Sequence, residues 1–211
     1  MISGREIANG IGAAFAIAKG EEGWEERFDM SAEQVFRSGW AIPLAIPAML
    51  LGLEAKRRIA FAEPATDAAQ IIAAMTPLTY YISQSLVFLL VWAAEIGLLI
   101  AIAQRREMGW KISPMIIGAN WAKFLFVIAS GLITGAAILT GALGFAAIGG
   151  MIAYGVLFYL RWGIIRRTLD MSPLRTAGML AVLAMASVAV STIVSLAMVL
   201  LGLVELEVPT A

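Results

Sequence analysis

The fold is decided by the stretch WAAEIGLLIAIAQRREMGWKISPMIIGANWAK, residues 92–123. It joins the second half of one apolar segment, a short basic turn and the first half of the next apolar segment. If the turn marks a membrane edge, Glu95 and Lys123 each lie about 7–8 residues, or roughly 10–12 Å, inside it at 1.5 Å per residue. Ionisable groups inside a bilayer pair with one another or face water. The stretch therefore predicts two antiparallel membrane helices with a polar cluster of Glu95, Asn120 and Lys123 between them.

The composition is that of a polytopic membrane protein. The chain has 211 residues, of which 61% are hydrophobic, and its mean hydropathy is +0.87, whereas soluble domains are about 45–50% apolar. Cys and His are both absent, which removes disulfides, thiolate nucleophiles, imidazole bases and the usual zinc and haem ligands. We therefore expect no catalytic, metal or cofactor site. Lys+Arg and Asp+Glu both number 15 and no long basic run occurs, so we expect no nucleic-acid partner.

Five segments are predicted to cross the membrane as helices, which makes the expected fold all-α. The first is short and contains Pro43 and Pro47, each of which removes a helical hydrogen bond, so a re-entrant segment is the alternative there. The expected organisation is a cytoplasmic or interfacial segment at 1–34, a five-helix transmembrane domain at 35–203 and an acidic tail at 204–211. The five spans are expected at 35–53, 78–103, 115–139, 142–162 and 176–203.

The distribution of basic residues favours five full spans. With five spans, eleven Lys and Arg residues fall on one side and three on the other, Lys56, Arg57 and Arg58. With a re-entrant first segment the two sides would be equal. Basic residues concentrate on the cytoplasmic side, so we expect the N-terminus in the cytoplasm and the C-terminus outside. The eleven are Arg5, Lys19, Arg27, Arg37, Arg105, Arg106, Lys111, Arg161, Arg166, Arg167 and Arg175.

The N-terminal segment is expected to form an amphipathic helix. Ile7, Ile11 and Phe15 recur every four residues, which places them on one face of a helix. One interpretation lays this face on the membrane surface, with Trp24 and Phe28 as interfacial contacts. The other packs it against loops of the protein itself. The pattern leaves both open.

Two short segments flank the first span. Ser31 and Gln34 fit a capping box, in which a hydroxyl and an amide satisfy free N–H groups at a helix start, so a helix should begin at about Ala32. On the other side of the span, residues 64–75 are expected to form a short external helix.

Small residues in the last three spans are candidate helix-packing positions. Glycines four residues apart let helices approach closely, and the short uncharged turn at 140–144 predicts that spans three and four form a tight hairpin. Serines one turn apart on the last span either line a pathway or bond within the helix bundle. The positions are Gly131, Gly135, Gly149, Gly150, Gly155, Ser187, Ser191 and Ser195.

Three motifs resemble those of an uncharacterised family of alphaproteobacterial inner-membrane proteins. Residues 28–33 with 37–38 match its FD-x-S-x-E…RS pattern, residues 120–122 match the NWA of its YNWAN, and residues 162–169 match W-x-I-x-R-x-x-L. The resemblance implies a location in the bacterial inner membrane. Lys123 stands where that family has a second Asn, so the resemblance carries over to the asparagine of the NWA motif and not to the lysine.

Two functions follow as hypotheses. In the first, the polar cluster is a buried network that fixes helix register, and the protein is a non-catalytic organising, scaffold or accessory subunit acting through protein or lipid contacts. Its topology is similar to that of Yip1-type membrane proteins, by analogy only. In the second, Glu95, Asn120 and Lys123 line the pathway of a small-solute or ion carrier. The expected partners are the lipid bilayer and either a second copy or another membrane protein.

Overall fold

The computed structural model describes residues 2–27, 31–62, 69–70, 72 and 75–202. This part of the chain is helical and contains no strand, and five of its helical segments are long and apolar enough to cross a membrane. The predicted all-α membrane fold with five spans is confirmed. The helices are α1 (Gly4–Lys19), α2 (Ala32–Ser38), α3 (Ala41–Ala62), α5 (Pro77–Arg105), α6 (Ile112–Thr140), α7 (Leu143–Thr168) and α8 (Pro173–Leu200), with 3₁₀ turns η1 (Trp24–Arg27) and η2 (Gly109–Lys111).

The first span consists of α2 and α3, separated by a break at Gly39 and Trp40. As predicted, its helix begins at Ala32, and the Ser31 hydroxyl accepts a hydrogen bond from the N–H of Gln34 at 3.2 Å. Helix α3 continues through Pro47 for 22 residues, about 33 Å at 1.5 Å per residue. That length covers a hydrocarbon layer of about 30 Å, so this segment has no need to turn back within the bilayer.

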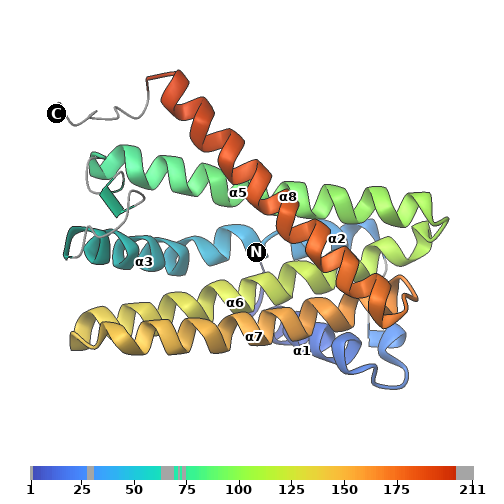
Figure 1. The fold of residues 1–211 in the computed structure, drawn as a ribbon. Coiled ribbons are helices and arrows are strands. Elements are labelled where there is room, and N and C mark those ends of the chain that lie inside the picture. The colour runs from blue at the N-terminus through green and yellow to red at the C-terminus, as the bar shows by residue number, and fades with distance from the viewer. Residues whose placement is uncertain (1, 28–30, 63–68, 71, 73–74, 203–211) are drawn as a thin grey trace.

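Helix α6 lies at the centre of the bundle. It forms an antiparallel hairpin with α7, as predicted, and contacts α3 along another face, while α5 and α8 pair with each other. Figure 1 shows α8 crossing α5 at an angle, and shows the α5–α6 and α7–α8 turns at the same end of the molecule as α1. The two ends of the bundle therefore differ, because α1 covers only one of them.

Helix α1 packs against α6 and α7. A Cβ at Gly10 would overlap the ring of Trp121, and one at Gly163 would overlap the backbone of Ala18. The buried residues of α1 are glycine, alanines and Ile17, whereas Ile7, Ile11 and Phe15 are only partly buried. The helix thus packs on helices of the protein, where the sequence suggested loops. Its placement on a membrane surface stays a prediction.

Some expectations concern residues outside the described ranges. These are the contact of Phe28 with the membrane interface, most of the external helix at 64–75, the end of the last span at Leu203 and the acidic tail at 204–211.

Candidate functional site

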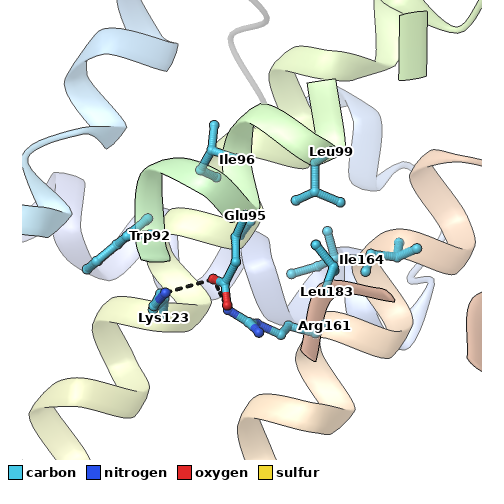
Figure 2. Close-up of a pocket in the computed structure, with 10 residues that line it drawn as sticks. Trp92, Glu95, Ile96, Leu99, Lys123, Arg161, Ile164 and Leu183 are labelled. Carbon is cyan, nitrogen blue, oxygen red and sulfur yellow. Dashed lines mark hydrogen bonds and ion pairs between the residues drawn. The ribbon is translucent and has the colours of Figure 1, made fainter. Parts of the chain in front are cut away.

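The Glu95 carboxylate is the point at which four helices meet. Lys123 Nζ on α6 lies 2.7 Å and Arg161 Nη2 on α7 lies 2.5 Å from Glu95 Oε2. The Ser187 hydroxyl on α8 lies 2.9 Å from Glu95 Oε1. Figure 2 shows the lysine and the arginine converging on the carboxylate from two sides. We call Glu95, Lys123, Arg161 and Ser187 the carboxylate cluster.

The side chains of this cluster are shielded to different degrees. Those of Glu95 and Lys123 are each 9% exposed, whereas that of Arg161 is 21% exposed. The Lys123 ammonium also lies 5.1 Å from the ring centroid of Trp92 and 5.7 Å from that of Phe88. Such cation–π contacts favour a cation held away from water. The lysine is therefore fully engaged inside the bundle, and the arginine retains access to its edge.

The cluster carries one more positive than negative charge. Glu95 contributes one negative charge, and Lys123 and Arg161 contribute one positive charge each. Ser187 adds no charge, and its single proton is shared between Glu95 and the carbonyl of Leu183, which also lies 2.9 Å away. One carboxylate thus faces two cations, so the formal charges leave one positive charge without a counterion within the cluster.

Asn120 belongs to a second, neighbouring set of hydrogen bonds. The Trp92 Nε1–H donates to Asn120 Oδ1 at 2.9 Å, and Asn120 Nδ2 donates to Ser38 Oγ at 3.0 Å. The Ser38 hydroxyl in turn donates to the Val35 carbonyl at 2.7 Å. The side chains of Trp92, Asn120 and Ser38 are all buried. This chain of bonds joins α5, α6 and α2.

The space beside the carboxylate cluster is small. A cavity of ≈ 20 Å³ lies between Trp92, Glu95, Lys123, Arg161 and the apolar side chains around them. A cavity needs about 10–15 Å³ to admit one water molecule. This space is large enough for about one water molecule and too small for a larger solute.

Three of the glycines expected to pack helices lie on the described helix contacts. A Cβ at Gly131 would overlap the backbone of Ala48 on α3, and one at Gly149 would overlap Ile133 on α6. A Cβ at Gly135 would lie 3.6 Å from Leu51, an ordinary contact. Helix α6 thus approaches α3 closely at Gly131, and α7 approaches α6 closely at Gly149.

Gly150 and Gly155 are different. A Cβ at either position would meet no atom within 4 Å among the described residues. The close approach expected at these two positions is not made within this part of the chain: Gly155 is exposed, and Gly150 is partly buried without a close neighbour.

The three serines of the last span separate in the structure. Ser187 contacts Glu95 and belongs to the carboxylate cluster. Ser195 is exposed and Ser191 is partly buried, and no hydrogen bond of either hydroxyl is found among the described residues. The three therefore line no continuous polar path.

Sequence analysis missed Arg161 as a member of the site. It assigned this residue to the basic end of span four because it ended that span at Trp162, whereas α7 continues to Thr168. Arg161 lies seven residues before that end, the same depth that identified Glu95 and Lys123. Placing the end of this span at Thr168 and applying the same depth criterion to the turn between α7 and α8 finds it.

Comparisons with protein-family models, with curated proteins and with solved structures give no match to this chain. The resemblance to an inner-membrane family stays a prediction. Within the described residues, no group of three Asp or Glu side chains is placed to hold a metal ion.

Proposed function

We propose that this chain is a non-catalytic integral protein of the bacterial inner membrane that acts as an organising, scaffold or accessory subunit through protein or lipid contacts. The observation that carries the proposal is the carboxylate cluster, in which the side chains of Glu95 and Lys123 are each 9% exposed. Glu95 is surrounded by donors from three other helices beside a space of ≈ 20 Å³. Buried ion pairs of this kind specify one helix arrangement even where they add little stability. The cluster then acts as a clamp of the bundle.

The proposed orientation places the N-terminus in the cytoplasm and the C-terminus in the periplasm. It is supported by the end of the bundle that carries α1 and the α5–α6 and α7–α8 turns (Figure 1). Most of the basic residues lie near that end, whereas Lys56, Arg57 and Arg58 lie at the far end of α3. These three are outnumbered by the eleven basic residues assigned to the other side, and the side richer in Lys and Arg is the cytoplasmic one.

A carrier of a small solute or ion is the second candidate. The observation that favours it is the unbalanced positive charge of the cluster together with the partial exposure of Arg161. A carrier needs a site that solute reaches from each side in turn. A carrier requires water to reach Glu95, Asn120 and Lys123 from at least one side, whereas the scaffold proposal predicts that water does not reach them.

Cysteine labelling of this naturally Cys-free chain tests the choice. Single cysteines would replace Ala94, Ala119 and Ala122 beside the cluster, with Ala8→Cys and Thr140→Cys as controls at the two exposed ends. A membrane-impermeant thiol reagent would be applied from each side. We expect each control to react from one side only, and no reaction at the three cluster positions in the same time.

Labelling of the cluster positions from either side would contradict the scaffold proposal and support the carrier. Cross-linking of the full chain in its native membrane is the second arm. We expect an adduct either of two copies or with another membrane protein. Recovery of the monomer alone, at a cross-linker dose that joins known subunits of the same membrane, would contradict action through protein contacts and leave lipid contacts as the proposed function.

A further inference from the structure

A lateral groove runs between α7 and α8 on the side of the bundle that faces the membrane. Its volume is ≈ 460 Å³, within the range of about 300–1,000 Å³ that ligand sites occupy. One wall is formed by Tyr154, Leu157 and Phe158 of α7, and the other by Ala177, Leu180, Ala181 and Ala184 of α8. Apart from the tyrosine hydroxyl, these lining side chains are apolar.

The sequence of α8 explains why the groove is there. Ala177, Ala181 and Ala184 are spaced four and three residues apart, so they share one face of the helix. Their methyl groups are too short to reach the larger side chains of α7. Helix α8 also diverges from the bundle as it crosses α5 (Figure 1), and only four of its residues are buried, Thr176, Met179, Leu183 and Met198.

Arg161 forms the polar end of this otherwise apolar groove. The same side chain lines the groove and the small cavity at Glu95. In the described part of the chain, Glu95 is the one acceptor that its guanidinium reaches, although a guanidinium has five N–H donors. None of its nitrogens is both fully buried and unpaired. Donors of Arg161 are therefore available to a ligand in the groove.

The charge of the cluster defines what such a ligand must be. Glu95 balances one of the two cations, and one positive charge remains. Helix α7 has 26 residues, about 39 Å, and Arg161 lies about 10 Å from its end, or about 6 Å inside a hydrocarbon layer of about 30 Å. An unbalanced charge at this depth is costly. An anionic group on a hydrocarbon chain satisfies both the arginine and the apolar walls.

We propose that this groove binds an anionic phospholipid, with one acyl chain along the alanine face of α8 and the headgroup phosphate accepting hydrogen bonds from Arg161. This inference rests on the proposed function, since it identifies the lipid in its lipid contacts. Arginine is suited to the task because its planar fork binds phosphate through two N–H groups at once. The headgroup enters from the end of the groove that lies nearest the turn between α7 and α8, which follows Thr168 and precedes Pro173.

Native mass spectrometry of the full chain, released from detergent, tests the proposal. The protein would be titrated with phosphatidylglycerol and, separately, with phosphatidylcholine of the same acyl chains. We expect phosphatidylglycerol to be retained at a concentration about tenfold lower, or about 1.4 kcal/mol. Both lipids have the phosphate, but the choline cation of phosphatidylcholine cancels the negative charge that would balance the cluster. Equal retention of the two lipids would overturn the proposal.

Two pairs of variants locate the site. Ala181→Trp fills the groove and leaves the charges intact, and Ala189→Trp places the same ring on an exposed position of α8 outside the groove. Arg161→Gln removes the proposed donor to the lipid phosphate, and Arg166→Gln removes a nearby exposed charge. We expect Ala181→Trp and Arg161→Gln to abolish the preference, and the two controls to keep it.

Three results would contradict the proposal. The first is an unchanged preference in Ala181→Trp, which decides the matter even if Arg161→Gln does not fold. The second is an equal loss in Arg166→Gln, which would indicate general surface charge. The third is preferential retention of oleate over phosphatidylglycerol, which would make the occupant a fatty acid. If the lipid preference is absent while the cysteines beside Glu95 stay unlabelled, the proposed function stands without this inference.

Discussion

Two clusters of similar residues join helices at different depths in this bundle. Glu95 is held by Lys123 and Arg161, and Glu54 accepts hydrogen bonds from Tyr81 and from Arg58 near the other end of the bundle. The Glu95 side chain is 9% exposed and that of Glu54 is 29% exposed. Loss of the carboxylate charge should therefore destabilise the protein more at Glu95 than at Glu54. At Glu54 the side chains that lose their partner are exposed enough to be hydrated.

Glu95→Gln is expected to have the largest effect. It leaves Lys123 and Arg161 without a counterion inside the bundle, which should lower the free energy of unfolding by about 3–5 kcal/mol. Unfolding in mixed micelles, followed by circular dichroism as dodecyl sulfate replaces the mild detergent, measures this loss. A loss below about 1 kcal/mol, typical of exposed pairs, would mean that water reaches the cluster.

Lys123→Met should cost less than half as much as Glu95→Gln. Arg161 still neutralises the carboxylate at 2.5 Å, and removing one cation brings the formal charge of the cluster to zero. Methionine also fills the space beside the rings of Trp92 and Phe88. The same titration measures the loss. A cost equal to that of Glu95→Gln would show that the lysine alone compensates Glu95.

Asn120→Ala should lower the free energy of unfolding by about 0.6–1.7 kcal/mol, the range measured for hydrogen bonds between membrane helices. It removes the acceptor of the Trp92 N–H and the donor to Ser38. Because the Trp92 indole then loses its hydrogen bond, its ultraviolet resonance Raman signal should shift as well. An unchanged signal would contradict the arrangement.

Glu54→Gln, the matched control for Glu95→Gln, should change the free energy of unfolding by only about 0–1 kcal/mol. The side chain of its partner Arg58 is 61% exposed and will be solvated when the pair is lost. The measurement is again the detergent titration, repeated at low and high salt. An effect as large as that at Glu95 would remove the distinction between the two clusters.

The smallest effect is expected at Glu6, where α1 is tied to α2 by an ion pair with Arg37. The backbone N–H of Ser3, its hydroxyl and the Arg37 guanidinium hold the pKa of Glu6 below its ordinary value of 4.5. Because the pKa of Glu6 is lower in the folded state, its ionised carboxylate stabilises α1 above about pH 4.5. This contribution is lost as the pH falls through the pKa that Glu6 has in the folded protein. The protection factors for amide hydrogen exchange in residues 4–19, which are corrected for the intrinsic rate at each pH, should then fall below pH 4.5. Glu6→Gln should abolish that fall. If the protection factors still fall in the variant, Glu6 is not the group that causes the pH dependence of α1.

The sequence predicted the parts of this molecule that depend on local pattern. Five apolar runs predicted five helices, and equal distances from one turn brought Glu95 and Lys123 to the same depth. Arg161 was missed because the fourth span was expected to end at Trp162, whereas α7 continues to Thr168.

Other parts of the site depend on how separate helices cross. Ser187 reaches Glu95 because α8 crosses α5 (Figure 1), and Ser38 reaches Asn120 because α2 lies against α6. The relative placement of two helices is not encoded in the spacing of residues within one segment, so hydropathy and periodicity could not show these contacts.

The central claim is that the charge of Glu95 clamps the bundle within a cluster that has one cation in excess. The most direct test compares Glu95→Gln with the double variant Glu95→Gln/Lys123→Met in the same detergent titration. We predict that the double variant is the more stable of the two, because one unpaired cation remains inside the bundle where the single variant leaves two. If adding Lys123→Met lowers the free energy of unfolding further, the two charges are not coupled as described, and the account is wrong.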